Sequence, residues 1–121
     1  MGAQHLNPVS IMCQLTQWQI QHLATHVADN LPFRLDELED VDQLMFGDSI
    51  RLCVDFDVDA LNNVTVSEAE ILDRDWDILH TDSFALLHYL EPMVERYNLY
   101  RQQAVAQCRD AQRETQQGRY F

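Results

Sequence analysis

Residues 50–58 read IRLCVDFDV, and apolar and polar side chains alternate along the whole stretch. A period of two is typical of a β-strand with one buried face and one solvated face, because successive side chains point to opposite sides. We therefore expect a strand here. Its buried positions are Ile50, Leu52, Val54, Phe56 and Val58. Its solvated face then carries Arg51 and Cys53, followed by a row of three carboxylates, Asp55, Asp57 and Asp59.

A second strand is expected directly after this one. Leu61-Asn62-Asn63 is a turn candidate, since asparagine tolerates a left-handed backbone, and Val64 begins a new β-branched run. The two strands would form a hairpin near residues 49–72. Ser67-Glu68-Ala69-Glu70 also fits a helix-capping box, but we favour a strand to about Leu72 and a third strand around 74–80.

Helices are predicted on both sides of the hairpin. An N-terminal helix should start after Pro8-Val9-Ser10 and end at Asn30 and Pro32, because apolar residues recur at three- and four-residue steps. These residues are Ile11, Met12, Leu15, Trp18, Leu23, Val27 and Leu31. Residues 33–46 have helical apolar spacing among many acidic residues and are interpreted as a short acidic helix, with a turn at Gly47-Asp48.

A long C-terminal helix should begin at the capping cluster Thr81-Asp82-Ser83. Its near-heptad apolar stripe includes Leu86, Leu90, Met93, Tyr97, Tyr100, Ala104, Cys108 and Ala111. Pro92 interrupts the stripe and should kink or split the helix. The stripe could pack on the protein's own sheet. Alternatively, it could pair with a second copy, and Leu90, Met93, Tyr97, Tyr100, Ala104 and Cys108 would then form a dimer interface.

The predicted fold class is α+β in a single domain, residues 1–121. A small antiparallel sheet of two or three strands packs with an N-terminal helix and a long C-terminal helix. A hydrophobic content of 46% is ordinary for a folded protein. Cys13, Cys53 and Cys108 are far apart and odd in number, which favours free thiols in a reducing compartment. No signal peptide or membrane segment is evident, so we expect a cytoplasmic protein.

The charge is concentrated in the middle of the chain. The formal net charge is -12, and residues 29–82 hold 16 of the 20 acidic groups with only three arginines, a net of −13. So negative a segment repels nucleic acid, because nucleic-acid binding depends on neutralising phosphates with basic groups. A basic protein surface is the natural partner, although plain solubility is an alternative explanation of the acidity.

Other motifs are weaker. The calcium-loop motif D-x-D-x-D occurs at Asp55 and at Asp73, but the loop's required glycine and final glutamate are missing in both places. His22 and His26 have a metal-chelating spacing on the N-terminal helix but no acidic neighbour there. Nothing singles out a catalytic pair, a nucleophile or a phosphate-binding loop. We therefore predict no catalytic residue, metal or cofactor, and a protein that is not an enzyme.

The functional hypothesis is an acidic protein-binding module that imitates the charge of a nucleic acid. Alternate strand residues lie about 6.6 Å apart on one face, a spacing similar in scale to that of successive phosphates. Inhibitors made by phages and mobile elements against host nucleases or defence complexes act in this way as a class. The predicted partner-binding residues are Asp55, Asp57, Asp59, Asp36, Glu37, Glu39, Asp40, Asp42, Asp73, Asp75 and Asp77. The alternative is a dimeric structural or chaperone-like assembly protein built on the C-terminal helix.

Overall fold

The computed structural model describes residues 13–118, and side chains as far as residue 108. Its elements, in chain order, are α2 (Gln17–Asp29), the 3-10 turn η1 (Leu35–Glu37), β1 (Val41–Met45), β2 (Ile50–Val58), β3 (Val64–Leu72) and α3 (His80–Gly118). The fold is therefore α+β, as the sequence predicted. Along the chain, one helix precedes the three-stranded antiparallel sheet and one follows it.

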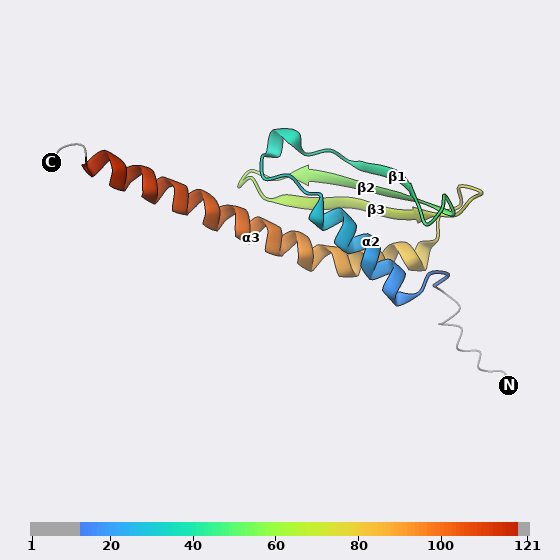
Figure 1. The fold of residues 1–121 in the computed structure, drawn as a ribbon. Coiled ribbons are helices and arrows are strands. Elements are labelled where there is room, and N and C mark those ends of the chain that lie inside the picture. Colours follow the sequence, from blue (N-terminus) through green and yellow to red (C-terminus); the bar gives the residue numbers. More distant parts are fainter. Residues whose placement is uncertain (1–12, 119–121) are drawn as a thin grey trace.

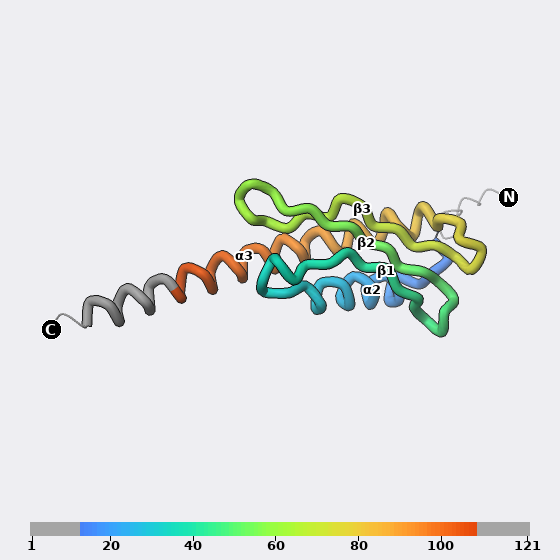
Figure 2. The backbone as a smooth tube through the Cα atoms, turned by 90° about the horizontal axis from the view of Figure 1, so that it is seen from above, coloured from blue at the N-terminus to red at the C-terminus, as the bar shows by residue number. Residues whose placement is uncertain are grey.

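The sheet has the order β1-β2-β3, so β2 is the central strand. Both helices lie on the same side of the sheet, and the other side is open (Figures 1 and 2). The core fills the space between the sheet and the helices. It is made of Ile20, Leu23, Ala24 and Val27 from α2, Ile50, Leu52, Val54, Val64 and Ile71 from the sheet, and Leu79, Leu86, Leu90 and Val94 from α3 and the residue before it.

The predicted hairpin is present, and its strand boundaries agree with the alternation in the sequence. Ile50, Leu52 and Val54 are buried, and Asn62 adopts the left-handed conformation (φ 63°) that the turn requires. The alternation weakens toward the turn, where Val58 is exposed. The turn predicted at Gly47-Asp48 is also present, and both of its residues have positive φ.

The prediction of an acidic helix at 33–46 is wrong. This stretch forms the short turn η1 and then strand β1, whose Val41 and Met45 pair with Val54 and Ile50. The physical reason is that β2 offers a free edge, and that Val41 and Met45 pack against the core from a strand paired there. Pairing with β2 satisfies the β1 backbone, whereas a helix would have stacked like charges one turn apart.

The prediction of a third strand around 74–80 is also wrong. Residues 73–77 form a tight turn in which the Asp73 carboxylate accepts hydrogen bonds from the N–H groups of Asp75 and Asp77. Ile78 makes one isolated bridge to Leu72, and α3 has begun by His80. Aspartate at the first position of a turn competes successfully with an extended backbone because its side chain binds N–H groups two residues on.

The first described helix begins later than expected. Residues 13–16 are not helical, and α2 starts at Gln17 with a capping box between Thr16 and Gln19. The two side chains accept hydrogen bonds from backbone N–H groups that have no carbonyl partner within the helix, and so they fix its start. The earlier part of the predicted helix, residues 8–12, lies outside the described residues.

The helix α3 is continuous through Pro92, so the predicted split does not occur. A proline inside a helix removes one hydrogen bond. The buried side chains of Leu90 and Val94, on either side of it, hold the helix against the core. Farther along, hydrogen bonds join α3 to β3 and to the segment after α2. The Asn98 side chain accepts from the Val64 N–H and donates to the Val64 carbonyl, and the Tyr97 hydroxyl donates to the carbonyl of Pro32.

Candidate functional site

The open face of the sheet is a grid of side chains fixed by the strand register. Residues directly opposite on neighbouring strands share a face. The rows across β1, β2 and β3 are Leu44–Arg51–Leu72, then Asp42–Cys53–Glu70, then the pair Asp55–Glu68, and finally Asp57–Thr65. Asp40, just before β1, lies beside the third row, where its carboxylate accepts a hydrogen bond from the Phe56 N–H at 3.0 Å.

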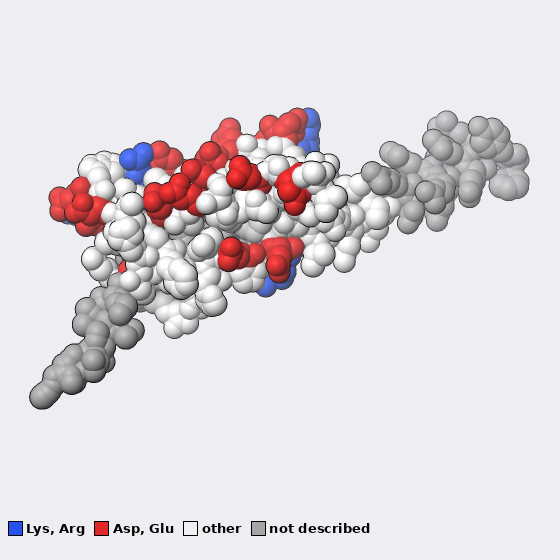
Figure 3. All heavy atoms as spheres, turned by 180° about the vertical axis from the view of Figure 1, so that it is seen from behind, with Lys and Arg blue, Asp and Glu red and all other residues white. Residues whose placement is uncertain are grey.

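Six carboxylates therefore share this face: Asp40, Asp42, Asp55, Asp57, Glu68 and Glu70. Figure 3 shows acidic side chains gathered along the sheet side of the molecule. Among the described residues, one of these six, Asp42, has an ion-pair partner. The middle of the face is thus an uncompensated negative surface.

Desolvation and the crowding of like charges both act on two of these carboxylates. The pKa of Asp55 is raised by partial desolvation and then by the negative charges of Asp40, Glu68 and Asp57. The pKa of Glu70 is raised by desolvation, by a hydrogen bond with Glu68 and by the charges of Glu68 and Asp55. Both shifts mean that the charged form is less favourable in the folded protein than in water. A cation placed on this face would relieve that repulsion.

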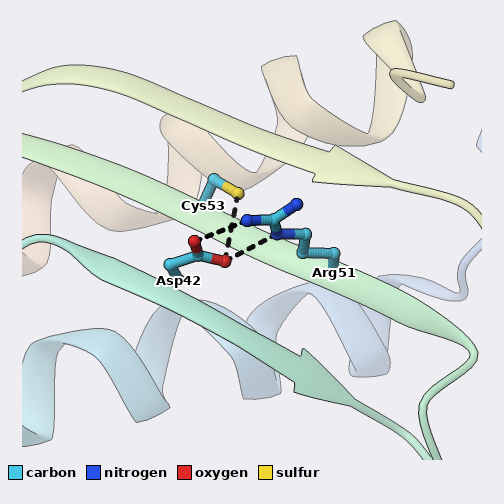
Figure 4. Close-up of polar contacts among 3 residues, drawn as sticks. All are labelled: Asp42, Arg51 and Cys53. Carbon is cyan, nitrogen blue, oxygen red and sulfur yellow. Dashed lines mark hydrogen bonds and ion pairs between the residues drawn. The ribbon is translucent and has the colours of Figure 1, made fainter. Parts of the chain in front are cut away.

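Asp42, Arg51 and Cys53 form a separate cluster at the junction of β1 and β2 (Figure 4). The Arg51 guanidinium donates two hydrogen bonds of 2.6 Å to the Asp42 carboxylate, which lower the pKa of Asp42. The Cys53 Sγ lies 3.8 Å from Asp42 Oδ1. Burial and the Asp42 charge raise the pKa of the Cys53 thiol, so this thiol is not poised as a nucleophile.

The structure brings together only some of the residues predicted to bind a partner. Asp40, Asp42, Asp55 and Asp57 share the open face. Asp59 does not continue their row. Its carboxylate accepts hydrogen bonds from the N–H groups of Leu61 and Asn63 and closes the hairpin turn. The others lie in two loops: Asp36, Glu37 and Glu39 around η1, and Asp73, Asp75 and Asp77 after β3.

The sequence analysis missed two residues of this face, Glu68 and Glu70. They face Asp55 and Cys53 from β3. The available signal was the alternation in β3, but an extra residue obscures it. Asp55 pairs with Glu68 and Phe56 with Val66, which leaves Ser67 as a bulge without a partner.

The residues predicted for a dimer interface divide between the core and the surface. Leu90 is fully buried in the protein's own core, and Met93 and Tyr97 pack against that core. Tyr100 is 67% exposed, Ala104 is half-buried and Cys108 is exposed. Leu90 is therefore closed to a second copy, whereas Tyr100, Ala104 and Cys108 remain accessible to one.

The histidines of α2 have neighbours of other kinds. The His22 ring stacks on Trp18 at 5.6 Å between centroids, and His26 Nε2 lies 2.9 Å from the side-chain nitrogen of Gln43. Within the described residues, no three histidine, cysteine or acidic side chains form a group that could hold a metal ion.

Comparison with known proteins gave no match: no family model, no curated protein and no solved structure is similar to this chain. In the described part of the chain, no helix combines the length and apolarity needed to cross a membrane.

Proposed function

We propose that this protein is a binding module that captures a basic protein surface on the open face of its sheet. The observation that carries the proposal is the group Asp40, Asp55, Asp57, Glu68 and Glu70. These carboxylates share one solvent-facing sheet surface, and partial desolvation together with like-charge repulsion raises the pKa of two of them, Asp55 and Glu70. A basic partner would replace that repulsion with attraction and would be steered toward the face at long range.

The partner that suits this face best is a protein with a nucleic-acid-binding groove. Asp55 and Asp57 are alternate residues of one strand, about 6.6 Å apart, and the neighbouring strands add parallel rows of carboxylates. A face of this kind offers a basic groove a charge array similar in scale to a phosphate backbone. In this role the protein would be a nucleic-acid mimic, such as a phage or mobile-element inhibitor of a host nuclease or defence complex.

The test is capture of a partner from an extract of the native host, followed by salt elution. Neutralising the face with Asp40→Asn, Asp55→Asn and Glu68→Gln keeps every side chain's size and the hydrogen bond to Phe56. We expect this variant to lose the protein that the wild type captures, and we expect the wild-type complex to weaken as salt screens the charges.

A matched control carries the same change of charge elsewhere: Asp29→Asn, Glu91→Gln and Glu95→Gln, three exposed residues of the helix layer. It should capture the partner as well as the wild type does. Equal capture by the face variant would contradict the proposal.

A second candidate is an assembly role through α3, favoured by one observation. The helix continues past the end of the sheet (Figure 1), and Leu99 and Tyr100 are exposed on the part of it that lies level with the hairpin turn. In this case Tyr100, Ala104 and Cys108 would meet a second copy. Light scattering tests it: a dimer that Tyr100→Arg converts to a monomer supports the assembly role, whereas a strict monomer at high concentration contradicts it.

A further inference from the structure

One end of the open face differs from the acidic middle. Its row is Leu44–Arg51–Leu72, and the Trp76 ring lies next to it. Leu44 is 50% exposed and Trp76 is 56% exposed. Together with Arg51 and neighbouring residues they line a shallow cavity of about 150 Å³. An aliphatic and an aromatic side chain exposed together at one cavity form a patch of the kind that marks interaction sites.

The turn fixes the Trp76 backbone, and the Trp76 ring packs on Arg51. Its backbone has φ 66°, a left-handed conformation that bulky residues rarely adopt, and the Trp76 N–H donates to the Asp73 carbonyl. The ring lies against the Arg51 guanidinium, 4.7 Å from its centroid. Arg51 is in turn clamped by two hydrogen bonds to Asp42. Tryptophan and arginine are the residue types that most often dominate protein interfaces.

We propose that this end of the face is an anchoring pocket for one apolar side chain of a basic, extended segment of a partner protein. The inference rests on the proposed function and specifies the ligand. The acidic middle selects basic residues by charge complementarity, and the pocket formed by Leu44, Arg51 and Trp76 receives an apolar residue of the same segment.

The strand geometry fixes the spacing within that segment. The pocket row and the Asp55 row lie four positions apart on β2, since Asp55 is the fourth residue after Arg51. At about 3.3 Å per residue, the two rows are roughly 13 Å apart. An extended ligand that lies along β2 therefore places its apolar residue four positions from a basic residue.

Synthetic peptides test this directly. The probe is the labelled peptide Leu-Ser-Thr-Ser-Arg-Ser-Arg, compared with a version in which Ser replaces Leu and a version in which Leu directly precedes the first Arg. Binding is measured by fluorescence anisotropy at low salt. We expect the first peptide to bind on the order of tenfold more tightly than the other two, as the burial of one apolar side chain predicts.

Two tryptophan variants locate the effect. Trp76→Ala should remove the preference for the leucine peptide and leave the binding of the serine peptide unchanged. The matched control is Trp18→Ala on α2, which removes a tryptophan that is 69% exposed on the helix side of the sheet. It should keep the preference. Leu44→Ser gives an independent loss of the preference, so the test does not depend on the folding of one variant.

The outcomes separate the two proposals. If the leucine and serine peptides bind equally and Asp55→Asn with Glu68→Gln weakens both, the anchoring pocket is refuted and the acidic face stands. If no peptide binds, the anchoring pocket is refuted, and the acidic face is decided by the capture of a partner from the host extract. The emission of Trp76 in a Trp18→Phe background gives a further check. A shift on raising the protein concentration without peptide would mean that a second copy occupies the pocket, and it would overturn the inference.

Discussion

Asp82 is a fully buried carboxylate in the first turn of α3. Its two oxygens accept hydrogen bonds from the N–H groups of Gln14 and Leu15, at 2.8 to 3.0 Å. These two donors precede α2, so a single side chain joins segments 67 and 68 residues apart in the chain. The position at the start of a helix also favours its negative charge.

We predict that Asp82→Ala lowers the free energy of unfolding by about 1–3 kcal/mol, because it leaves two backbone N–H groups without their acceptor. Asp82→Asn should cost less, since one acceptor oxygen remains. Urea denaturation measures both. Asp75→Asn in the turn after β3 is the control and should leave the denaturation midpoint unchanged. A midpoint for Asp82→Ala equal to that of the wild type would show that water replaces the carboxylate at no cost.

At the scale of one element, β3 shows how a single residue can hide a strand's pattern. Inward-facing Val64 and Val66 are followed by inward-facing Ala69 and Ile71, and Ser67 is the extra residue between the two pairs. Without Ser67 the strand would read VTVEAEI, which alternates without a break. The bulge thus lets both halves of the strand keep their apolar side chains on the core.

We therefore predict that deletion of Ser67 is tolerated. The ladder would become regular, Glu68 and Glu70 would stay on the open face, and the free energy of unfolding should change by no more than about 1 kcal/mol. Deletion of Ala69 is the contrasting variant. It turns a glutamate toward the core, and burial of an unpaired charge removes a large part of a domain's marginal stability. Thermal melts of both variants check this; cooperative melting of the Ala69 deletion near the wild-type temperature would refute the register argument.

The same element explains which parts of the fold could be predicted from the sequence. The strand at 50–58 could be predicted because its alternation is a local signal that the core preserves. Residues 41–45 could not, because their strand exists only through pairing with β2. At 74–80 the alternation was real, but the Asp73 carboxylate holds the turn by hydrogen bonds that a periodicity count does not detect.

The candidate site was predictable to a similar extent. Asp55 and Asp57 follow from the alternation of one strand alone. Glu68 and Glu70 required the register between two strands, which the Ser67 bulge shifts by one residue. Asp59 was assigned to the same row by its spacing, yet the strand ends at Val58 and the turn uses its carboxylate. A period of two therefore identifies the residues of a face only as far as the strand continues.

On the scale of the whole molecule, the two-layer fold brings the crowded carboxylates together on the side of the sheet that the helices leave open. Both helices cover one side of the sheet, and the crowded carboxylates lie on the other side (Figures 1 and 3). The folded chain brings Asp40, Asp55, Glu68 and Glu70 closer together than an unfolded chain would. The net charge of -12 should therefore oppose folding at neutral pH and low salt.

This arrangement predicts that mild acidification stabilises the protein. Asp55 and Glu70 have raised pKa values, so the folded state takes up protons at a higher pH than the unfolded state does. By linkage, stability must rise as the pH falls from neutral toward those raised pKa values. Asp42 acts in the opposite direction, because its hydrogen bonds with Arg51 lower its pKa. The stability that Asp42 contributes is present above the ordinary carboxyl pKa, and it is lost as the pH falls through the lowered pKa of Asp42. The melting temperature should therefore pass through a maximum at mildly acidic pH.

Asp55→Asn combined with Glu70→Gln removes the two groups responsible for the rise. We expect this variant to melt at a higher temperature than the wild type at neutral pH and to gain little on acidification. Glu91→Gln with Glu95→Gln changes the net charge equally but lies on α3, and it should keep the rise. Scanning calorimetry at several pH values, at low salt, makes the comparison. A wild-type melting temperature that falls steadily from neutral pH downward would show that repulsion among the carboxylates of the open face does not measurably destabilise the folded protein. That result would also remove the electrostatic argument for a basic partner.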